Sequence, residues 1–135
     1  MLKAKDVMNT NVLSVQKDTP IFEAIQLLVD HNISGLPVVK DDMSLVGILS
    51  EKDVIDLFYE REKAENRKVE DYMTEPAVHF DENSALVNVC AFLLKNIFRR
   101  VPVTSEGKVI GIISVKDVLS SILHLRKKKV GSTKG

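Results

Sequence analysis

The sequence has no tryptophan, one cysteine and few aromatic residues, and these shortages constrain what the protein can be. The core must be built from Val, Ile, Leu and Met. The single cysteine, Cys90, cannot form an internal disulfide, which is typical of a reducing compartment. No apolar run approaches the roughly 18 residues of a membrane span, and the charged N-terminus MLKAKDVM differs from a signal peptide. These features predict a cytoplasmic protein without a membrane partner.

The chain also lacks an excess of either charge, because 19 Lys and Arg residues balance 19 Asp and Glu residues. No strong overall field therefore draws it toward nucleic acid or anionic lipid, and we do not expect a nucleic-acid partner. A local basic run remains at Arg126–Lys129. Its simplest interpretation is a helix end whose cations complement the helix dipole, followed by a basic flexible tail at 127–135. Contact with nucleic acid or an acidic partner is the alternative.

The sequence shows no arrangement of residues typical of catalysis or of metal binding. His31, His79 and His124 are scattered, and they form no metal-ligand spacing with one another or with Cys90. No nucleophile–base pair and no phosphate-binding loop is present. We therefore expect no catalytic residue, no metal and no required cofactor, and we do not expect an enzyme.

Internal repetition is the strongest feature of the sequence. The phrase GILSEKD at 47–53 returns as GIISVKD at 111–117, 64 residues later. A shift of 65 residues aligns the preceding part, with one single-residue gap near Ser44. The aligned pairs there include Asp6/Asp71, Met8/Met73, Leu28/Leu93, Pro37/Pro102 and Val38/Val103. A match over nearly the whole chain predicts two copies of one structural unit.

Each copy is expected to run strand, helix, strand, strand, helix. The expected strands are 12–15, 36–39 and 45–49, and then 77–80, 101–104 and 109–113. Helices with one buried face are indicated by Ile21, Ala24, Ile25, Leu28 and Val29, and by Leu86, Val89, Cys90, Leu93 and Leu94. The capping place of the first helix is taken by Thr19, which Pro20 follows, and that of the second by Ser84. The closing helices are expected to bury Val54, Ile55 and Phe58, and Val118, Leu119 and Ile122.

The two copies are expected to form one body of mixed α+β class with approximate twofold symmetry. The first repeat, with a connecting helix, covers 1–66, and the second covers 67–126. A unit of about 60 residues is marginally stable alone, so the copies should pack against each other.

The repeated phrase follows a strand and opens a helix, which allows two interpretations. In the first, Ser50 and Asp53 form a capping box that satisfies free helix amides. This leaves Gly47 unexplained, because glycine inside a strand often marks the close approach of a ligand or another backbone. In the second, the Asp carboxylate accepts hydrogen bonds from a ribose diol, as in dinucleotide-binding folds. The two roles are compatible, because a carboxylate has several lone-pair positions.

With these motifs the chain resembles a tandem pair of CBS domains, also called a Bateman module, acting as a stand-alone regulatory protein. The resemblance rests on GILSEKD and GIISVKD, on LPVV and VPVT, and on the DVM and DYM starts, and covers roughly 3–125. It implies an adenosine cleft with Asp53 and Asp117 on the ribose, and Ser50 and Ser114 near ribose or phosphate. It also implies contacts to the base from Ser14, Val15, Leu36, Pro37, His79, Phe80, Val101 and Pro102.

The copies differ where the first has Ser34-Gly35 and the second has Arg99-Arg100. Because arginine binds phosphate well, the cleft lined by Arg99 and Arg100 is expected to prefer phosphorylated adenosine. The other cleft would take a less charged ligand such as S-adenosylmethionine, or stay empty. A solvated pair on a loop is the alternative interpretation of the two arginines.

The sequence therefore predicts an adenine-nucleotide sensor in signal transduction. It would bind AMP, ADP, ATP or S-adenosylmethionine between its repeats and modulate an effector protein. The resemblance also implies a homodimer. A nucleic-acid-binding module and a purely structural dimerisation module are the alternatives.

Overall fold

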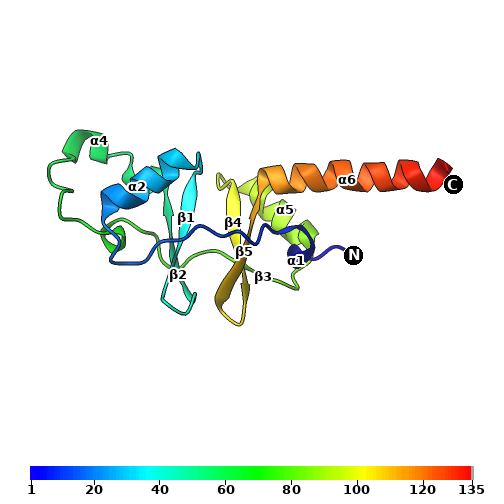
Figure 1. Cartoon of the computed structure of the whole chain (residues 1–135), viewed down its shortest axis with the longest axis horizontal. Coiled ribbons are helices and arrows are strands. Elements are labelled where there is room, and N and C mark those ends of the chain that lie inside the picture. The colour runs from blue at the N-terminus through cyan, green and yellow to red at the C-terminus, as the bar shows by residue number, and fades with distance from the viewer. Residues whose placement is uncertain (135) are drawn as a thin grey trace.

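The computed structural model describes the backbone of residues 1–134 and the side chains of residues 1–128, and contains two repeats of mixed helices and strands (Figure 1). The first repeat and its connection contain α1 (Ala4–Val7), α2 (Ile21–Asp30), β1 (Gly35–Val39), β2 (Leu45–Ser50), α3 (Glu51–Val54) and α4 (Leu57–Glu60). The second contains the 3-10 helix η1 (Val69–Asp71), β3 (Phe80–Asp81), α5 (Leu86–Lys95), β4 (Arg100–Ser105), β5 (Lys108–Ser114) and α6 (Val115–Lys134). The expected fold class is confirmed.

Each repeat builds a small sheet in the same way. β1 pairs antiparallel with β2, as β4 does with β5, and both hairpins have a register shift at the equivalent place. The first expected strand of each repeat is much shorter than predicted: Val15 alone bridges Val38, and only β3 pairs with β4. The other four strands lie where the sequence places them, each with one or two additional residues.

The two sheets are joined through their hairpin turns, which lie side by side in Figure 1. The backbone amide of Leu45 donates to the carbonyl of Gly107 at 3.0 Å, and the amide of Val109 donates to the carbonyl of Met43 at 2.9 Å. Hydrogen bonds between the repeats fix their relative orientation, which positions the residues that follow β2 and β5.

The repeats exchange their first segments, so the packed bodies differ from the sequence repeats. Ala4 in α1 is fully buried in a core made otherwise by the second repeat, and Val69 in η1 is fully buried in the core of the first. Figure 1 accordingly shows α1 beside α5, far from α2. Backbone bridges fasten both segments, Lys3 to Ala85 and Lys68 to Pro20, and these pairs are related by the 65-residue shift.

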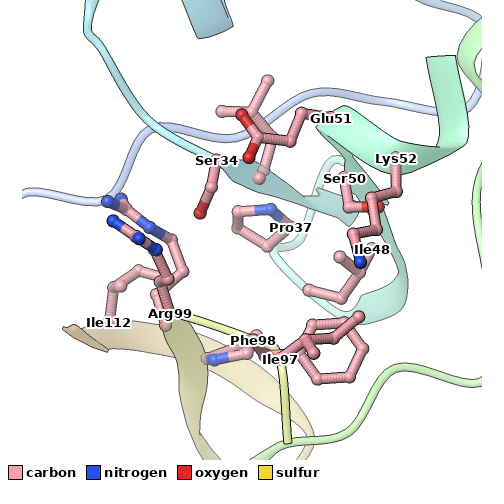
Figure 2. A pocket seen from close by; sticks show the side chains of 14 residues that line it. Ser34, Pro37, Ile48, Ser50, Glu51, Lys52, Ile97, Phe98, Arg99 and Ile112 are labelled. Atoms are coloured by element: carbon pink, nitrogen blue, oxygen red, sulfur yellow. The ribbon is translucent and has the colours of Figure 1, made fainter. Parts of the chain in front are cut away.

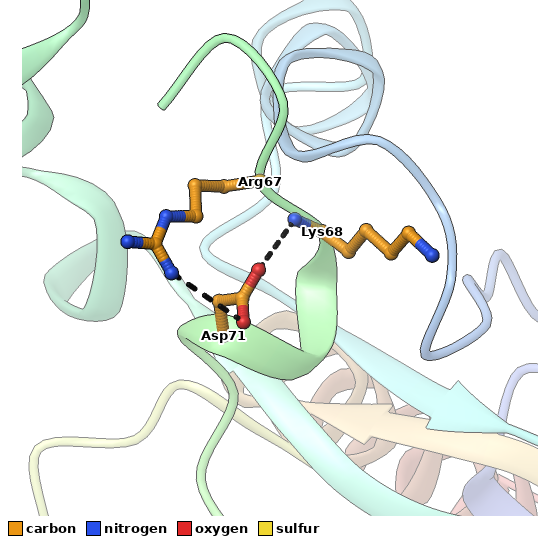
Figure 3. Close-up of polar contacts among 3 residues, drawn as sticks. All are labelled: Arg67, Lys68 and Asp71. Carbon is orange, nitrogen blue, oxygen red and sulfur yellow. Dashed lines mark hydrogen bonds and ion pairs between the residues drawn. The ribbon is translucent and has the colours of Figure 1, made fainter. Parts of the chain in front are cut away.

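An aspartate fixes the start of each exchanged segment. The Asp71 carboxylate accepts the Lys68 backbone amide at 2.9 Å and lies 3.9 Å from the guanidinium of Arg67 (Figure 3). In the first repeat, Asp6 accepts the Lys3 amide at 2.7 Å. The aspartates of the DVM and DYM motifs therefore cap the starts of two short helical turns, and each motif spans the end of its turn.

The predicted capping of the amphipathic helices is wrong by one residue. Helix α2 has Pro20 as its N-cap, and the Thr19 hydroxyl accepts the Gln16 amide at 3.0 Å instead. Helix α5 has Ala85 as its N-cap, where Ser84 was expected, and neither cap residue makes a side-chain hydrogen bond to its helix. Since proline and alanine side chains have no acceptor, these helices depend on packing.

Several residues predicted to be buried are exposed in the chain. Val54 is buried and Val118 half-buried as expected, whereas six other apolar side chains lie open to solvent. They are Val29, Ile55, Phe58, Leu94, Leu119 and Ile122. The helical periodicity correctly gave an apolar face, but one of the five predicted positions in α2 and in α5, and two of the three in each closing helix, are exposed.

Helix α6 projects beyond the body as far as Lys134 (Figure 1). The predicted flexible tail at 127–135 falls mostly outside the residues whose side chains are described. In the described part of the chain, no helix combines the length and apolar character needed to cross a membrane.

Candidate functional site

Both repeated aspartates cap the helix that follows their strand. Asp53 Oδ2 accepts the Ser50 amide at 2.8 Å, and Asp117 Oδ2 accepts the Ser114 amide at the same distance. The Ser114 hydroxyl also donates to Asp117 Oδ2 at 2.9 Å. The capping interpretation of the phrase is therefore correct, and the remaining oxygen of each carboxylate decides what else it can bind.

The remaining oxygens are in different states. Asp53 Oδ1 accepts a hydrogen bond from the Thr74 hydroxyl at 3.2 Å. Among the hydrogen bonds of residues 1–128, none ends on Asp117 Oδ1. Asn9, the counterpart of Thr74, instead accepts the Asn11 amide through its side chain at 2.9 Å. Asp117 thus keeps a carboxylate oxygen free for a donor.

Asp117 lies on a cleft of about 470 Å³, here called the Asp117 cleft. Residues from both repeats line it: Asn9, Asn11, Val12, Leu13, His31, Ile33, Gly35, Pro37, Arg100, Ile112, Ser114, Lys116 and Asp117. The wall combines apolar side chains with three basic groups and one acid. This composition suits a ligand that has an apolar ring, hydroxyl groups and negative charge.

Asp53 lies on a much smaller cavity of about 70 Å³, the Asp53 cleft. Its lining is mostly apolar: Ile48, Ser50, Asp53, Thr74, Pro76, Ala77, Val78, Phe92, Phe98, Arg100, Val101 and Pro102. The repeat shift pairs most of these residues with a residue of the Asp117 cleft, for example Thr74 with Asn9 and Phe98 with Ile33. The two clefts are therefore versions of one design.

A third cavity, of about 80 Å³, lies between the repeats and is here called the central cavity (Figure 2). Arg99 and Ser34 lie on one side of it, and Ile97 and Phe98 lie across from Glu51. A wider polar groove of about 770 Å³, with Arg99, Lys116 and Ser114 in its wall, opens beside it. Arg99 therefore lines the space between the clefts, and its side chain is exposed.

Arg100 lines both clefts, the central cavity and the polar groove. Its Nε atom is buried and has no hydrogen-bond partner among the described residues. Burial lowers the pKa of the Arg100 guanidinium below its ordinary value, and the negative charge of Asp117 opposes that shift. A half-buried guanidinium whose buried Nε donor is unused favours an anionic ligand, which would supply the missing acceptor.

The residues expected at the base do not all lie on the cavities. Leu36 lines the central cavity, Pro37 and Pro102 line it together with one cleft each, and Val101 lines the Asp53 cleft. Ser14, Val15, His79 and Phe80 line none of the four cavities. Val15 is buried in its sheet, Phe80 packs on the core of the second repeat, and the His79 ring contacts the Ala77 carbonyl at 3.1 Å.

The chain segments lining the clefts lie one to three residues earlier than predicted. They are 11–13 in the Asp117 cleft and 76–78 in the Asp53 cleft. The repeat shift aligns these segments, and that alignment is the signal that could have identified them. Ile33 and Phe98, also missed, form another such pair.

The glycines of the repeated phrase mark close packing rather than a ligand. A Cβ atom on Gly47 would lie 2.6 Å from the Thr74 carbonyl oxygen. A Cβ atom on Gly111 would collide with the Met8 side chain. Both contacts come from the exchanged segments, and neither glycine lines any of the four cavities.

Comparison with known proteins gives this architecture a family. Residues 4–60 and 69–124 each match the model of the CBS domain. The chain is 32% identical over 115 residues to the uncharacterized protein MJ1225 of Methanocaldococcus jannaschii, covering 85% of this chain but only 41% of that protein.

Solved structures agree with this match. The crystal structure of CBSX2 in complex with AMP, a protein from Arabidopsis thaliana, superimposes with a TM-score of 0.84 at 30% identity, covering 93% of this chain and 99% of that one. The CBS domain pair of MJ0100, in complex with 5-methylthioadenosine and S-adenosyl-L-methionine, shares the fold with a TM-score of 0.76 at 24% identity, covering 93% and 98%. With both repeats matched in sequence and in structure, the chain belongs to the CBS domain family.

Proposed function

We propose that this chain is a regulatory module that binds an adenine nucleotide in the Asp117 cleft. The observation that carries the proposal is the free Oδ1 of Asp117 on a cleft of about 470 Å³. A ribose diol has two hydroxyl donors, and a carboxylate held by its own helix cap presents an acceptor to them without reorganising. Ser114, beside Asp117, would meet a further ribose or phosphate oxygen.

The remaining parts of a nucleotide also find matching groups in this cleft. Val12, Leu13, Ile33 and Pro37 offer apolar surface to a purine ring. Arg100 and Lys116 offer positive charge to a phosphate, and the amide end of α6 adds to it. Ser50, Asp53 and Val101 form the equivalent site of the Asp53 cleft, while Leu36 and Arg99 border the space between the two.

The similarity to CBSX2, whose structure contains AMP, supports an adenosine ligand and leaves its identity to experiment. AMP, ADP, ATP and S-adenosylmethionine all present the ribose that Asp117 would bind. Of these, the basic groups of the Asp117 cleft favour the phosphorylated ligands.

The output of the module would pass to an effector protein, in a cytoplasmic setting and without catalysis. Nucleotide binding can shift a partner only if two conformations of the module bind the ligand with different affinity. Exposed apolar residues on the helices, among them Ile55, Phe58, Leu119 and Ile122, would pair two chains as a homodimer. A structural dimerisation module without a ligand is the second candidate, because these same helix faces favour it.

A thermal-shift panel tests the proposal. AMP, ADP, ATP, S-adenosylmethionine, adenosine and GMP are compared on the same protein. A ligand that binds only the folded state adds about 2.7 kcal/mol of stability at a hundredfold excess over Kd. We expect stabilisation by at least one adenosine compound, and the response to GMP, which has the same ribose and phosphate as AMP, reports whether the cleft distinguishes the base. A flat response to the whole panel would favour the structural candidate.

A further inference from the structure

The two clefts are built from equivalent residues, but they differ in the space they enclose. Ser50 and Asp53 stand where Ser114 and Asp117 stand in the other cleft, and the repeat shift pairs segment 76–78 with 11–13. Nevertheless the Asp53 cleft encloses about 70 Å³ and the Asp117 cleft about 470 Å³. Something specific to the second repeat must close the smaller cleft.

Phe98 divides the space on the Asp53 side. It lines both the Asp53 cleft and the central cavity, which measure about 70 and 80 Å³. On the other side its counterpart Ile33 lines the Asp117 cleft and the polar groove, both of which are wide, at about 470 and 770 Å³. Ile48, Ser50, Arg100 and Pro102 line both cavities as well, but only Phe98 and Arg100 differ from their counterparts in the first repeat. Shortening the phenyl ring would add its volume to the space that the two cavities border. Figure 2 shows Phe98 in this wall of the central cavity.

Neighbouring aromatic rings hold Phe98 in this position. Phe92 stacks on Phe98 with ring centroids 6.0 Å apart and planes 9° apart, and Phe80 meets Phe92 edge-on at 5.8 Å. Phe92 also lines the Asp53 cleft. The row begins on the core of the second repeat and ends at Phe98, whose residue is 41% exposed. Phe98 is therefore held by stacking at the surface and can be replaced without opening the core.

The other differences between the clefts explain the closure less well. Arg100, the counterpart of Gly35, also borders the Asp53 cleft and the central cavity, but it borders the wide Asp117 cleft as well without closing it. Pro76, the counterpart of Asn11, borders the Asp53 cleft without separating it from the central cavity.

Resting on the proposed function, we propose that Phe98 limits each chain to one nucleotide by closing the Asp53 cleft. Asp53 then serves the fold in the wild-type protein, with its carboxylate held by Ser50 and Thr74. Replacement of Phe98 by isoleucine copies the first repeat and should open a second site that depends on Asp53.

Calorimetric titration with AMP tests this in six proteins: wild type, Asp117→Asn, Phe98→Ile, Phe98→Ala, Phe98→Ile with Asp117→Asn, and Phe22→Ile as control. Phe22, in α2, lines none of the four cavities and is 38% exposed, similar to Phe98. We expect one AMP per chain in the wild type and the control, and two in Phe98→Ile. Asp117→Asn should weaken the wild-type site at least tenfold, and the double variant should retain one site. Phe98→Ala should give the same result as Phe98→Ile.

The other outcomes distinguish a failure of the role of Phe98 from a failure of the proposed function. Two AMP per wild-type chain, or wild-type binding that survives Asp117→Asn undiminished, would overturn the role of Phe98 while supporting nucleotide binding. A single site in both Phe98→Ile and Phe98→Ala, with folding confirmed by thermal melting, would overturn it as well. A wild-type protein that binds no adenosine compound would contradict the proposed function itself.

Discussion

The Thr74 hydroxyl donates a 3.2 Å hydrogen bond to Asp53 Oδ1, and this bond joins the first segment of the second repeat to the repeated phrase at the end of the first sheet. With the Ser50 amide on Oδ2, both oxygens of Asp53 serve the fold. Asn9, at the same place in the first repeat, leaves Asp117 Oδ1 free. The difference between Thr74 and Asn9 therefore decides the state of the two carboxylates. Asp53 is used by the fold, and Asp117 is available to a ligand.

Replacing Thr74 by valine removes this bond and keeps the shape of the side chain. Because Thr74 is exposed, we expect a modest loss of about 0.5 kcal/mol in the free energy of unfolding. Urea denaturation measures it, with Thr10→Val as the control, since the described hydrogen bonds include none from the exposed Thr10 hydroxyl. Equal stability of Thr74→Val and wild type would show that the bond contributes nothing.

Replacing Gly47 by alanine should destabilise the protein by about 2 kcal/mol or more, because the new Cβ would lie 2.6 Å from the Thr74 carbonyl oxygen. Gly107 provides the matched control. Its φ of +80° makes alanine unfavourable by about 1–2 kcal/mol, but no atom lies within 4 Å of the new methyl group. Urea denaturation of both variants should rank Gly47→Ala as the worse. The reverse order would contradict the close approach of the exchanged segment.

Replacing Asp71 by alanine should cost about 1 kcal/mol, because the Lys68 amide loses its 2.9 Å cap. Replacing Arg67 by alanine should cost less than about 0.5 kcal/mol, since its ion pair with Asp71 is 3.9 Å long and largely exposed. Chemical denaturation of the two variants separates the cap from the ion pair. Equal losses would mean that the pair matters as much as the cap.

Replacing Arg100 by glutamine removes a charge that the phosphate of AMP would use. A hydrogen bond to a charged group is worth about 1.5–3 kcal/mol, so the ratio of AMP affinity to adenosine affinity should fall at least tenfold. Calorimetric titration with both ligands gives this ratio. The control is Arg61→Gln. Arg61 follows α4, is exposed, and donates to the Phe58 carbonyl at 2.7 Å. An unchanged ratio in Arg100→Gln would place the phosphate away from Arg100.

Much of the fold follows from the repeat alone. Matching apolar spacing in two aligned copies located both amphipathic helices and four of the strands. The exchange of 2–8 and 67–73 between the cores was not predictable, because a sequence repeat does not say which copy a segment packs against. The exposed faces of the closing helices were missed because periodicity marks an apolar face without identifying what covers it.

The candidate site was predicted in part. The two Asp–Ser pairs and the two arginines do lie on cavities, because the repeated order of strand, cap and helix fixes where the pairs point. The sequence placed the contacts to the base at 14–15 and 79–80, whereas segments 11–13 and 76–78 line the clefts. Each expected strand pairs through only one or two residues, and the rest of the segment runs along a cleft. The difference in volume between the two clefts depends on how the Phe98 ring packs, and no sequence motif predicts that packing.

Calorimetric titration of wild type and Asp117→Asn with AMP and with adenosine shows whether the Asp117 carboxylate holds the ribose. Asparagine keeps one oxygen for the helix cap and removes the negative charge that would hold the ribose. The account predicts at least tenfold weaker binding of both ligands, because both present the same ribose. Unchanged affinity of Asp117→Asn for both ligands would contradict it.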